Sequence, residues 1–513
     1  MEFSKYNDGV HWFISDTALR VVVESRTASD RYHLGKIVLQ SLKDGPDYIL
    51  QTDAATGELE TASSVLKRSV RCAVAMKKLG LVRGDVVVLM APHHLDLCIP
   101  FYASLYLGLT LSAIDTELGV LELKSAFGLI QPKLIFCQSN RAPNVQQALG
   151  ELGSSAQVVT FDNGNQCNHF GEFLERYGDN ADVDSFRAED FDPAETISLM
   201  APTSGTTGLR KFVATTHKGL AINTPYYFAS IVDYPPRTKK CLVISPLHLL
   251  TEMITYLHSP ILRYTRIQSS ANMTQEHMFY VINTYKPNFM LINPTMMTTL
   301  IRLRSREKCD FTCFEVIMIG GSAVPQSLVE DVKKITPKTE TYNVYGMSEV
   351  CTLAFNPVTE APGSSGKPLG CFQYRLVDMA TQRDILEPRV TGELWIKGPG
   401  IFKGYYNNPE ATKATFADGG WFKTGDLFYR DDNWNYYFVE RAKHLIKYYN
   451  HQVSPSEIEQ LIHQDPRVRE VVVTGMPGPM FGELPLTSFV KNHGESVTAQ
   501  DIKDIVKDDL TYS

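Results

Sequence analysis

A nine-residue stretch that combines glycines, hydroxyls and a lysine has the composition of a phosphate-binding loop. It reads Thr203-Ser-Gly-Thr-Thr-Gly-Leu-Arg-Lys211. The glycines let successive backbone N–H groups turn inward, the hydroxyls add donors, and Lys211 supplies a positive charge. The order differs from the Walker loop, because Leu209 and Arg210 separate the second glycine from the lysine. A polar turn between two strands would use the same residue types, so this stretch alone does not decide the function.

Two later segments offer groups that suit the rest of a nucleotide. Gly320 and Gly321 follow a predicted strand over 314–319, and glycines at a strand end let a planar ligand lie against bare backbone. A tight turn into a helix would also explain them. The stretch Asn343-Val-Tyr-Gly-Met-Ser-Glu349 then brings an aromatic ring, a hydroxyl and a carboxylate close together. Tyr345 can stack on a base, Ser348 can donate to a phosphate, and Glu349 has the hard oxygens that Mg²⁺ prefers.

Two more segments carry charge in the last quarter of the chain. Asp426 ends the stretch Gly420-Trp-Phe-Lys-Thr-Gly-Asp426, and an acidic residue after a glycine can accept both hydroxyls of a ribose. The stretch Arg441-Ala-Lys-His-Leu-Ile-Lys447 alternates in a way that predicts a strand edge with three cations. Cations on an edge strand also prevent aggregation, so this stretch is not diagnostic by itself.

Strands and helices alternate over most of the chain, which predicts a parallel sheet covered on both faces. The hydrophobic pattern predicts helices over 58–79 and 95–107, and strands over 86–90, 134–136, 197–200, 243–248 and 289–292. The polar segment 142–193 is predicted to lie on the surface. After Gly392, short alternating runs predict a β-rich section. Residues 454–513 predict helix, strand, strand, helix.

The bulk properties exclude several classes of protein. The 513 residues suggest roughly three to four compact units. A net charge of -7 argues against broad nucleic-acid or anionic-membrane binding. No apolar run is long enough for a transmembrane segment. Nine cysteines without a framework indicate a reduced, cytoplasmic setting, and a peroxisomal address is expected only if a longer form carries one.

Taken together and in this order, these segments resemble the adenylate-forming superfamily. The similarity is greatest to its branch of acyl-CoA synthetases, coumarate-CoA ligases and beetle luciferases. It extends from about residue 40 over nearly the whole chain and includes Gly404-Tyr-Tyr-Asn-Asn-Pro-Glu-Ala-Thr412. The resemblance implies an α/β fold: a large N-terminal AMP-binding domain (1–440) of two stacked αβαβα subdomains plus a β-rich subdomain. A small, mobile α+β C-terminal domain (441–513) would follow.

The resemblance also implies a two-step reaction with ATP, Mg²⁺ and coenzyme A. A carboxylic acid attacks the α-phosphate of ATP, and the coenzyme A thiolate then attacks the acyl-adenylate. The catalytic residues implied are Lys211, Ser348, Glu349 as the metal ligand, Lys443 as the pivot of the small domain, and Lys447 on its thioester-forming face. The nucleotide would contact Thr203, Ser204, Gly205, Thr206, Thr207, Gly208, Lys211, Gly320, Gly321, Ser322, Asn343, Tyr345, Gly346, Met347, Ser348, Asp426 and Arg441.

The acid site and the end of the chain depart from the family pattern. The histidine that the family usually has here stands one position earlier, as His248, and Leu249 takes its place. His248, Leu249 and Gly321 are expected to contact the acid. The family's C-terminal segment, which ends in an adenylating lysine, is missing before Ser513, so the small domain is expected to be truncated and adenylation impaired. The leading hypothesis is an acid-CoA ligase for a fatty or aromatic carboxylate. The alternative is a ligase-like binding protein, and the oligomeric state is left open.

Overall fold

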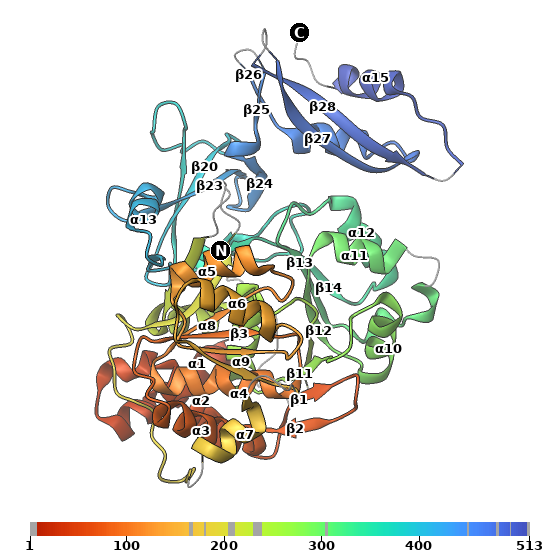
Figure 1. Ribbon diagram of the computed structural model, residues 1–513. Coiled ribbons are helices and arrows are strands. Elements are labelled where there is room, and N and C mark those ends of the chain that lie inside the picture. Colours follow the sequence, from red (N-terminus) through yellow and green to blue (C-terminus); the bar gives the residue numbers. More distant parts are fainter. Residues whose placement is uncertain are drawn as a thin grey trace.

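The computed structural model describes residues 8–163, 168–178, 181–203, 211–228, 239–302, 306–448, 451–478, 482–492 and 494–509. Figure 1 shows two large sheets with helices between and outside them, and a separate small sheet near the C-terminus. This mixed α/β architecture, with a large N-terminal part and a small C-terminal part, is the predicted fold class.

The first large sheet has eight strands in the order β21-β9-β8-β4-β3-β5-β6-β7. Its strands from β8 to β7 run parallel, and β9 pairs antiparallel with both β8 and β21. The strands are β3 (Val86–Met90), β4 (Thr110–Ala113), β5 (Leu134–Cys137), β6 (Gln157–Thr160), β7 (Asn168–His169), β8 (Ile197–Thr203), β9 (Lys211–Thr216) and β21 (Gly404–Tyr405).

The second large sheet has seven strands in the order β14-β13-β12-β10-β11-β1-β2, all parallel except β2. Parallel strands place their carboxyl ends at one edge, where α/β sheets bind ligands. The strands are β1 (Ile49–Asp53), β2 (Leu59–Thr61), β10 (Lys240–Leu242), β11 (Thr265–Gln268), β12 (Phe289–Ile292), β13 (Val316–Gly320) and β14 (Glu340–Val344).

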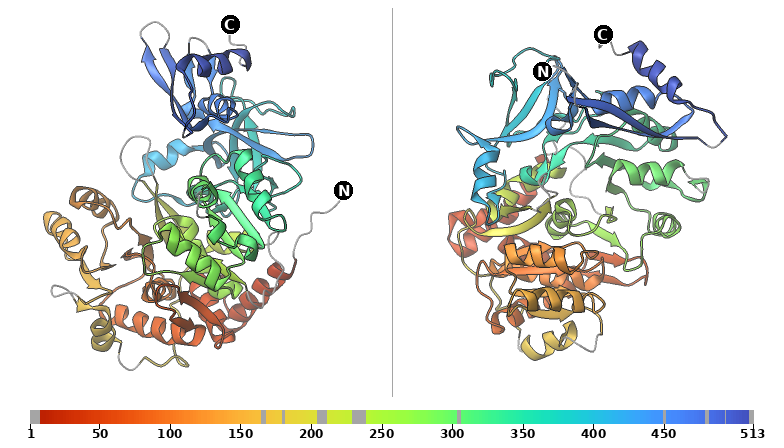
Figure 2. Two further views of the ribbon diagram at one scale, coloured as in Figure 1. Left: turned by 90° about the vertical axis from the view of Figure 1, so that its right-hand side faces the viewer. Right: turned by 45° about the horizontal axis from the view of Figure 1, so that its top comes forward.

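Alternating apolar side chains place helices on both faces of each sheet. In β3, Val87 and Leu89 join the central core, whereas Val86 and Val88 join an outer core. Helices of the central core are α1 (Asp8–Ser25), α2 (Leu34–Asp44), α3 (Ala62–Lys78), α4 (Cys98–Leu107), α7 (Phe170–Tyr177), α8 (His217–Phe228) and α9 (Leu250–Leu262). The outer helices are α5 (Val120–Ile130), α6 (Ala142–Glu151), α10 (Gln275–Tyr285), α11 (Pro294–Arg302) and α12 (Gln326–Ile335). Figure 2 shows the same layers from two other directions.

Three local predictions were wrong. The helix predicted over 58–79 begins at Ala62, because its first residues pair with β1 as β2. The strand predicted over 243–248 is mostly a loop: β10 ends at Leu242, Val243 makes one more backbone hydrogen bond to Ile267, and the buried Ile244 and Leu247 lie outside the strand. The segment 142–193 contains α6, β6, β7 and α7, and the rings of Phe161, Phe170 and Phe173 lie in the core. Its polar surface residues obscured these few aromatic contacts.

The β-rich section forms a five-stranded antiparallel sheet. Its order is β19-β20-β23-β22, with β24 paired to β23. Its strands are β19 (Gln373–Val377), β20 (Gly392–Lys397), β22 (Phe416–Ala417), β23 (Trp421–Arg430) and β24 (Tyr436–Arg441), and α13 (Pro409–Thr415) precedes β22. Short strand pairs lead into it: β15 (Gly346–Met347), β16 (Thr352–Leu353), β17 (Phe355–Asn356) and β18 (Lys367–Pro368).

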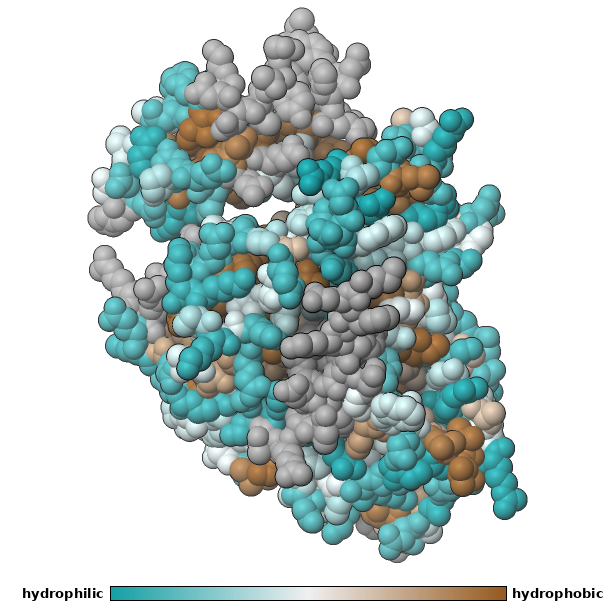
Figure 3. All heavy atoms as spheres, turned by 180° about the vertical axis from the view of Figure 1, so that it is seen from behind, coloured by the Kyte–Doolittle hydropathy of each residue, from teal (hydrophilic) through white to brown (hydrophobic). Residues whose placement is uncertain are grey.

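The C-terminal part is a separate four-stranded sheet in the order β26-β25-β28-β27. It has its own small apolar core, formed with two helices. Its elements are β25 (Ile446–Tyr448), β26 (His451–Val453), α14 (Pro455–Ile462), β27 (Val468–Gly478), β28 (Gly482–Lys491) and α15 (Ala499–Asp509). From behind, Figure 3 shows a hollow between this upper part and the body of the molecule.

The predicted edge strand over 441–447 is interrupted. β24 ends at Arg441, a single 3₁₀ turn covers Ala442–His444, and β25 belongs to the next sheet. The chain therefore changes sheets at the position of Lys443. Within the described ranges, no helix is both long and apolar enough to cross a membrane.

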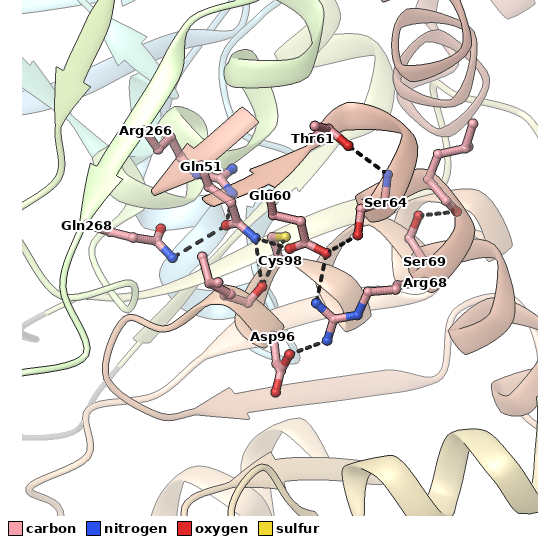
Figure 4. A network of polar contacts seen from close by, with 12 residues as sticks. Gln51, Glu60, Thr61, Ser64, Arg68, Ser69, Asp96, Cys98, Arg266 and Gln268 are labelled. Atoms are coloured by element: carbon pink, nitrogen blue, oxygen red, sulfur yellow. Dashed lines mark hydrogen bonds and ion pairs between the residues drawn. The ribbon is translucent and has the colours of Figure 1, made fainter. Parts of the chain in front are cut away.

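A fully buried arginine connects the seven-stranded sheet to the central helices (Figure 4). Arg266 on β11 donates to the Gln51 amide oxygen at 2.6 Å. It also donates to the Tyr102 hydroxyl at 2.7 Å and the Ser259 hydroxyl at 2.8 Å. Gln51 in turn donates to Glu60 at 2.7 Å. Glu60 is also paired with Arg68 of α3, which leads toward the surface. The guanidinium thus holds β1, α4 and α9 to one strand.

We expect Arg266→Ala to lower the free energy of unfolding by about 3 kcal/mol or more. The change leaves buried acceptors unsatisfied on three separate elements, and each costs about 1–3 kcal/mol. Urea unfolding followed by circular dichroism measures this loss. The control is Arg389→Ala, because that side chain is 75% exposed and its removal should cost less than about 0.5 kcal/mol. A small loss for Arg266→Ala would mean that water replaces the guanidinium.

Several buried histidines predict a loss of stability in acid. Burial lowers the pKa of His33 from 6.5 to about 4 and the pKa of His217 well below 6.5. Between pH 4 and pH 6.5 the unfolded chain binds more protons than the folded one. The contribution of these neutral histidines to the free energy of unfolding is therefore fully present above pH 6.5 and is lost as the pH falls toward 4. Both ring nitrogens of His217 are buried without a hydrogen-bond partner.

We therefore expect His217→Leu to reduce the difference in unfolding free energy between pH 7.5 and pH 5.0 by about 2 kcal/mol. Chemical unfolding at the two pH values measures it. Phe191→Leu is the matched control: its ring lies 4.7 Å from that of His217, so it loses similar packing but no titrating group. An unchanged pH difference in His217→Leu would contradict the interpretation.

Candidate functional site

The two ends of the glycine-rich loop meet at the edge of the eight-stranded sheet. Thr203 ends β8, Lys211 begins β9, and the two residues are partners in the antiparallel pair. The loop residues between them, Ser204, Gly205, Thr206, Thr207 and Gly208, lie outside the described residues. The strand β21 pairs with β9, and this pairing places Tyr405 beside Lys211. The Lys211 Nζ lies 4.8 Å from the centre of the Tyr405 ring.

Glu349 lies at the other end of the same tyrosine. It is buried in a short 3₁₀ turn, Ser348–Val350, and its carboxylate accepts a hydrogen bond from the Tyr405 hydroxyl at 2.8 Å. Its backbone oxygen accepts from the Phe402 N–H at 2.9 Å. Burial raises the pKa of Glu349, and the Tyr405 hydrogen bond opposes this rise. The predicted metal ligand and the predicted phosphate cation are therefore joined through one side chain.

Asn223 of α8 forms hydrogen bonds with the turn that carries Glu349. Its buried amide donates to the Val350 carbonyl at 3.2 Å and to the Gly400 carbonyl at 2.9 Å. A Cβ atom at Gly400 would collide with this amide, so a larger residue there would have to displace the Asn223 side chain from its two hydrogen bonds. Neither residue was predicted from the sequence. A buried amide in a helix carries no local signal of the loops that it will contact.

Asp426 and Arg441 form a second group at the join between sheets. They are paired residues on β23 and β24, and the Arg441 Nε lies 3.2 Å from a carboxylate oxygen of Asp426. The other carboxylate oxygen accepts from the Tyr345 hydroxyl at 2.6 Å. Asp426 is only 2% exposed, and burial raises its pKa, whereas Arg441 and Tyr345 oppose the rise. The charges of Asp426 and Arg441 also shift the pKa of Glu349, so the two groups share one electrostatic site.

The ring of Tyr345 lies against the β-rich section. Its centre is 4.8 Å from that of Phe428 and 6.3 Å from that of Phe438. Its hydroxyl also lies 3.6 Å from the Met347 sulfur. These contacts fix the ring while the hydroxyl orients Asp426.

The glycine pair lies at the carboxyl end of β13, next to the start of the Tyr345 segment. Gly320 pairs with Val344, and a Cβ atom there would meet the Val344 carbonyl. Gly321 has φ +94° and open space where a Cβ would lie. Bare backbone therefore faces an open position at this edge, as a planar ligand requires. The predicted nucleotide contacts nearby are exposed Ser322, half-buried Asn343, Gly346 and Met347 of β15, and half-buried Ser348.

The predicted acid contacts lie at the same edge of the seven-stranded sheet. His248 is half-buried and Leu249 is exposed, in the loop between β10 and α9. β10 is two strands from β13, so the loop after β10 and the glycine pair after β13 follow strands that end at the same edge.

Of the two predicted catalytic lysines near the C-terminal part, Lys443 has a described environment and Lys447 does not. Burial and the charge of Arg441 lower the pKa of Lys443, whereas Asp426 opposes this. Lys443 thus belongs to the electrostatic site of Asp426 and Arg441. Lys447 lies in β25, and its side chain is outside the described residues.

Sequence reasoning missed the role of Tyr405. The segment 404–412 resembled the family, yet nothing in its residue types indicated a contact with both Lys211 and Glu349. The contact depends on the pairing of β21 with β9, a strand that lies about 190 residues earlier in the chain.

Comparisons with known proteins identify the family and the fold. The family model of AMP-binding enzymes matches residues 40–406. The chain is 31% identical to a luciferin 4-monooxygenase of Photuris pensylvanica, over 90% of this chain and 86% of that protein. It is 28% identical to a 4-coumarate–CoA ligase of Humulus lupulus, over 92% and 87% of the two chains. Its fold superimposes on ATP-bound MatB from Rhodopseudomonas palustris with a TM-score of 0.81, 22% identity and coverage of 93% and 92%. The chain belongs to the family of AMP-binding enzymes.

Proposed function

We propose that this protein is an AMP-forming acid-CoA ligase that activates a fatty or aromatic carboxylate. One observation carries the proposal: Lys211, Glu349, Asp426 and Arg441 come from four distant segments and share one site. Two cations for phosphates, a carboxylate for a metal ion and a carboxylate for the ribose hydroxyls together suit a nucleoside triphosphate. Relatives named as coumarate–CoA ligases support the choice of coenzyme A as acceptor.

The proposed reaction has two steps. A carboxylate oxygen of the acid attacks the α-phosphorus of ATP, and pyrophosphate leaves. The thiolate of coenzyme A then attacks the acyl carbonyl, the carbonyl–phosphate bond breaks, and AMP leaves. In such transfers, the protein mainly positions the reactants and neutralises the developing charge.

Each part of the site has a proposed role. Lys211 and the loop from Thr203 hold the departing phosphates, and Ser348 contacts the α-phosphate. Asp426 accepts the ribose hydroxyls, because Tyr345 and Arg441 fix its two oxygens. The backbone of Gly320–Ser322 forms the shelf for adenine. His248, Leu249 and Gly321 contact the acid.

A magnesium ion fits the chemistry of Glu349. Magnesium usually binds one or two carboxylates together with substrate phosphates and keeps several waters. Over the described ranges no cluster of three or more His, Cys, Asp or Glu side chains could hold a metal by itself. A single buried carboxylate that shares Tyr405 with the phosphate-loop lysine fits an ion held mainly by the nucleotide. The ion would neutralise phosphate charge.

We also propose that residues 441–513 form a small unit that rotates between the two steps about Lys443. The chain leaves one sheet and enters another at this 3₁₀ turn, and the small unit has its own core. Rotation would exchange Lys443 for the face that carries Lys447, as domain rotations do when a site must serve two reactions.

The activity has a direct test. Purified protein with ATP, Mg²⁺ and a panel of fatty and aromatic acids should release pyrophosphate, and with coenzyme A it should form AMP and thioester. Pyrophosphate release and thioester absorbance or mass measure the two steps separately. Binding of ATP without turnover of any acid would favour the alternative, a ligase-like binding protein.

Asp426→Asn should weaken ATP binding about tenfold or more. The change removes a charged acceptor whose hydrogen bonds are each worth about 1.5–3 kcal/mol, while keeping the shape of the side chain. Isothermal titration calorimetry measures the affinity. Asp432→Asn is the matched control, since that carboxylate is 66% exposed and lies outside the site. Equal affinities in the two variants would remove Asp426 from the nucleotide site.

A further inference from the structure

Tyr405 lies between the Lys211 ammonium and the Glu349 carboxylate, two opposite charges that the proposed function requires to be unpaired. Its hydroxyl donates to a carboxylate oxygen of Glu349 at 2.8 Å, and its ring lies under the Lys211 ammonium at 4.8 Å. The lysine and the carboxylate thus contact different parts of one aromatic side chain. Throughout the described part of the chain, no ion pair within 4 Å joins Lys211 to a carboxylate.

A direct pair between these groups would work against nucleotide binding. Lys211 must be available for a phosphate and Glu349 for a metal ion, and a salt bridge between them would have to break first. The contacts with Tyr405 are easier to exchange. A cation over a ring contributes about 0.5–1 kcal/mol at an exposed site, and a phosphate oxygen is a stronger partner for the ammonium.

The backbone fixes the tyrosine in this position. β21 pairs with β9 through Tyr405 and Val213, two residues after Lys211. The next residue, Tyr406, donates its N–H to Phe212 and packs on the opposite side, against the outer core of the eight-stranded sheet. On the other side, the Phe402 N–H holds the backbone of Glu349. One short segment therefore sets the distance between strand β9 and the Glu349 turn.

We propose that Tyr405 is a positioning residue that keeps Lys211 and Glu349 from pairing before the nucleotide arrives. This inference rests on the proposed nucleotide site. It assigns the tyrosine two separable functions: the ring is the spacer and support for the ammonium, and the hydroxyl orients the carboxylate. Loss of the ring lets the ammonium reach Glu349 and compete with phosphate.

The test is ATP binding without Mg²⁺, measured by calorimetry in EDTA, so that the metal and the chemical steps do not contribute. Tyr405→Ala should weaken binding about fivefold, the size of one partly exposed ion pair. In the Glu349→Gln background, where no ion pair can form, the same tyrosine change should alter affinity less than about twofold. A purely structural role for Tyr405 would give the same loss in both backgrounds.

Two further variants complete the design. Tyr405→Phe keeps the spacer, so its Mg²⁺-free affinity should stay within about twofold of the native protein. Tyr406→Ala removes an equal side chain from the opposite side of the strand and should not change affinity in either background. Thermal melting of every variant shows that each is folded.

The outcomes separate the two proposals. If the native protein binds no ATP, the proposed function fails. If it binds ATP and Tyr405→Ala binds as tightly, or if Glu349→Gln does not suppress the loss, the spacer role is overturned and the nucleotide site stands.

Discussion

Two buried carboxylates, each held by a tyrosine hydroxyl, determine how the site is built. Asp426 accepts from Tyr345 and Glu349 accepts from Tyr405. A buried carboxylate is costly unless it is hydrogen-bonded or paired, and a neutral phenol satisfies it without removing its charge. Asp426 has a second partner, because the Arg441 Nε lies 3.2 Å from its other oxygen, whereas the carboxylate of Glu349 accepts from the Tyr405 phenol. The two phenol donors therefore satisfy buried acids without neutralising their charge.

This requirement explains why distant segments converge. Neither tyrosine is near its acid in sequence: Tyr345 and Asp426 are 81 residues apart, and Glu349 and Tyr405 are 56 apart. The β-rich section places Asp426 on β23 and packs the Tyr345 ring against Phe428 of that strand. The short strand β21 returns to the eight-stranded sheet and carries Tyr405 with it. The two sheets and the β-rich section thus each supply one part of a single site.

Residue types were easier to interpret from the sequence than the contacts between them. Val86–Met90 was predicted correctly because the run is short, rich in β-branched residues and bounded by turn signals. Glycines, acids and cations at predicted strand ends led to the prediction of a nucleotide site, which stays a prediction. The loop over 243–248 failed because its apolar residues are buried by tertiary contacts rather than by strand pairing. Asn223 and Tyr405 could not be found because their partners lie far along the chain, and one sequence does not show pairings over such distances.

Arg441 lies between the proposed ribose carboxylate and the contacts of the C-terminal part. The residue before it, Glu440, is buried and accepts hydrogen bonds from the backbone N–H and hydroxyl of Ser456 in α14. Adjacent residues of β24 therefore face two ways: Arg441 pairs with the proposed ribose carboxylate, and Glu440 holds the small unit. A rotation about Lys443 must exchange the Glu440 contact, while the Asp426 pair lies one residue away on the same strand. The proposed nucleotide contact and the proposed rotation would therefore act on adjacent residues of one strand, β24.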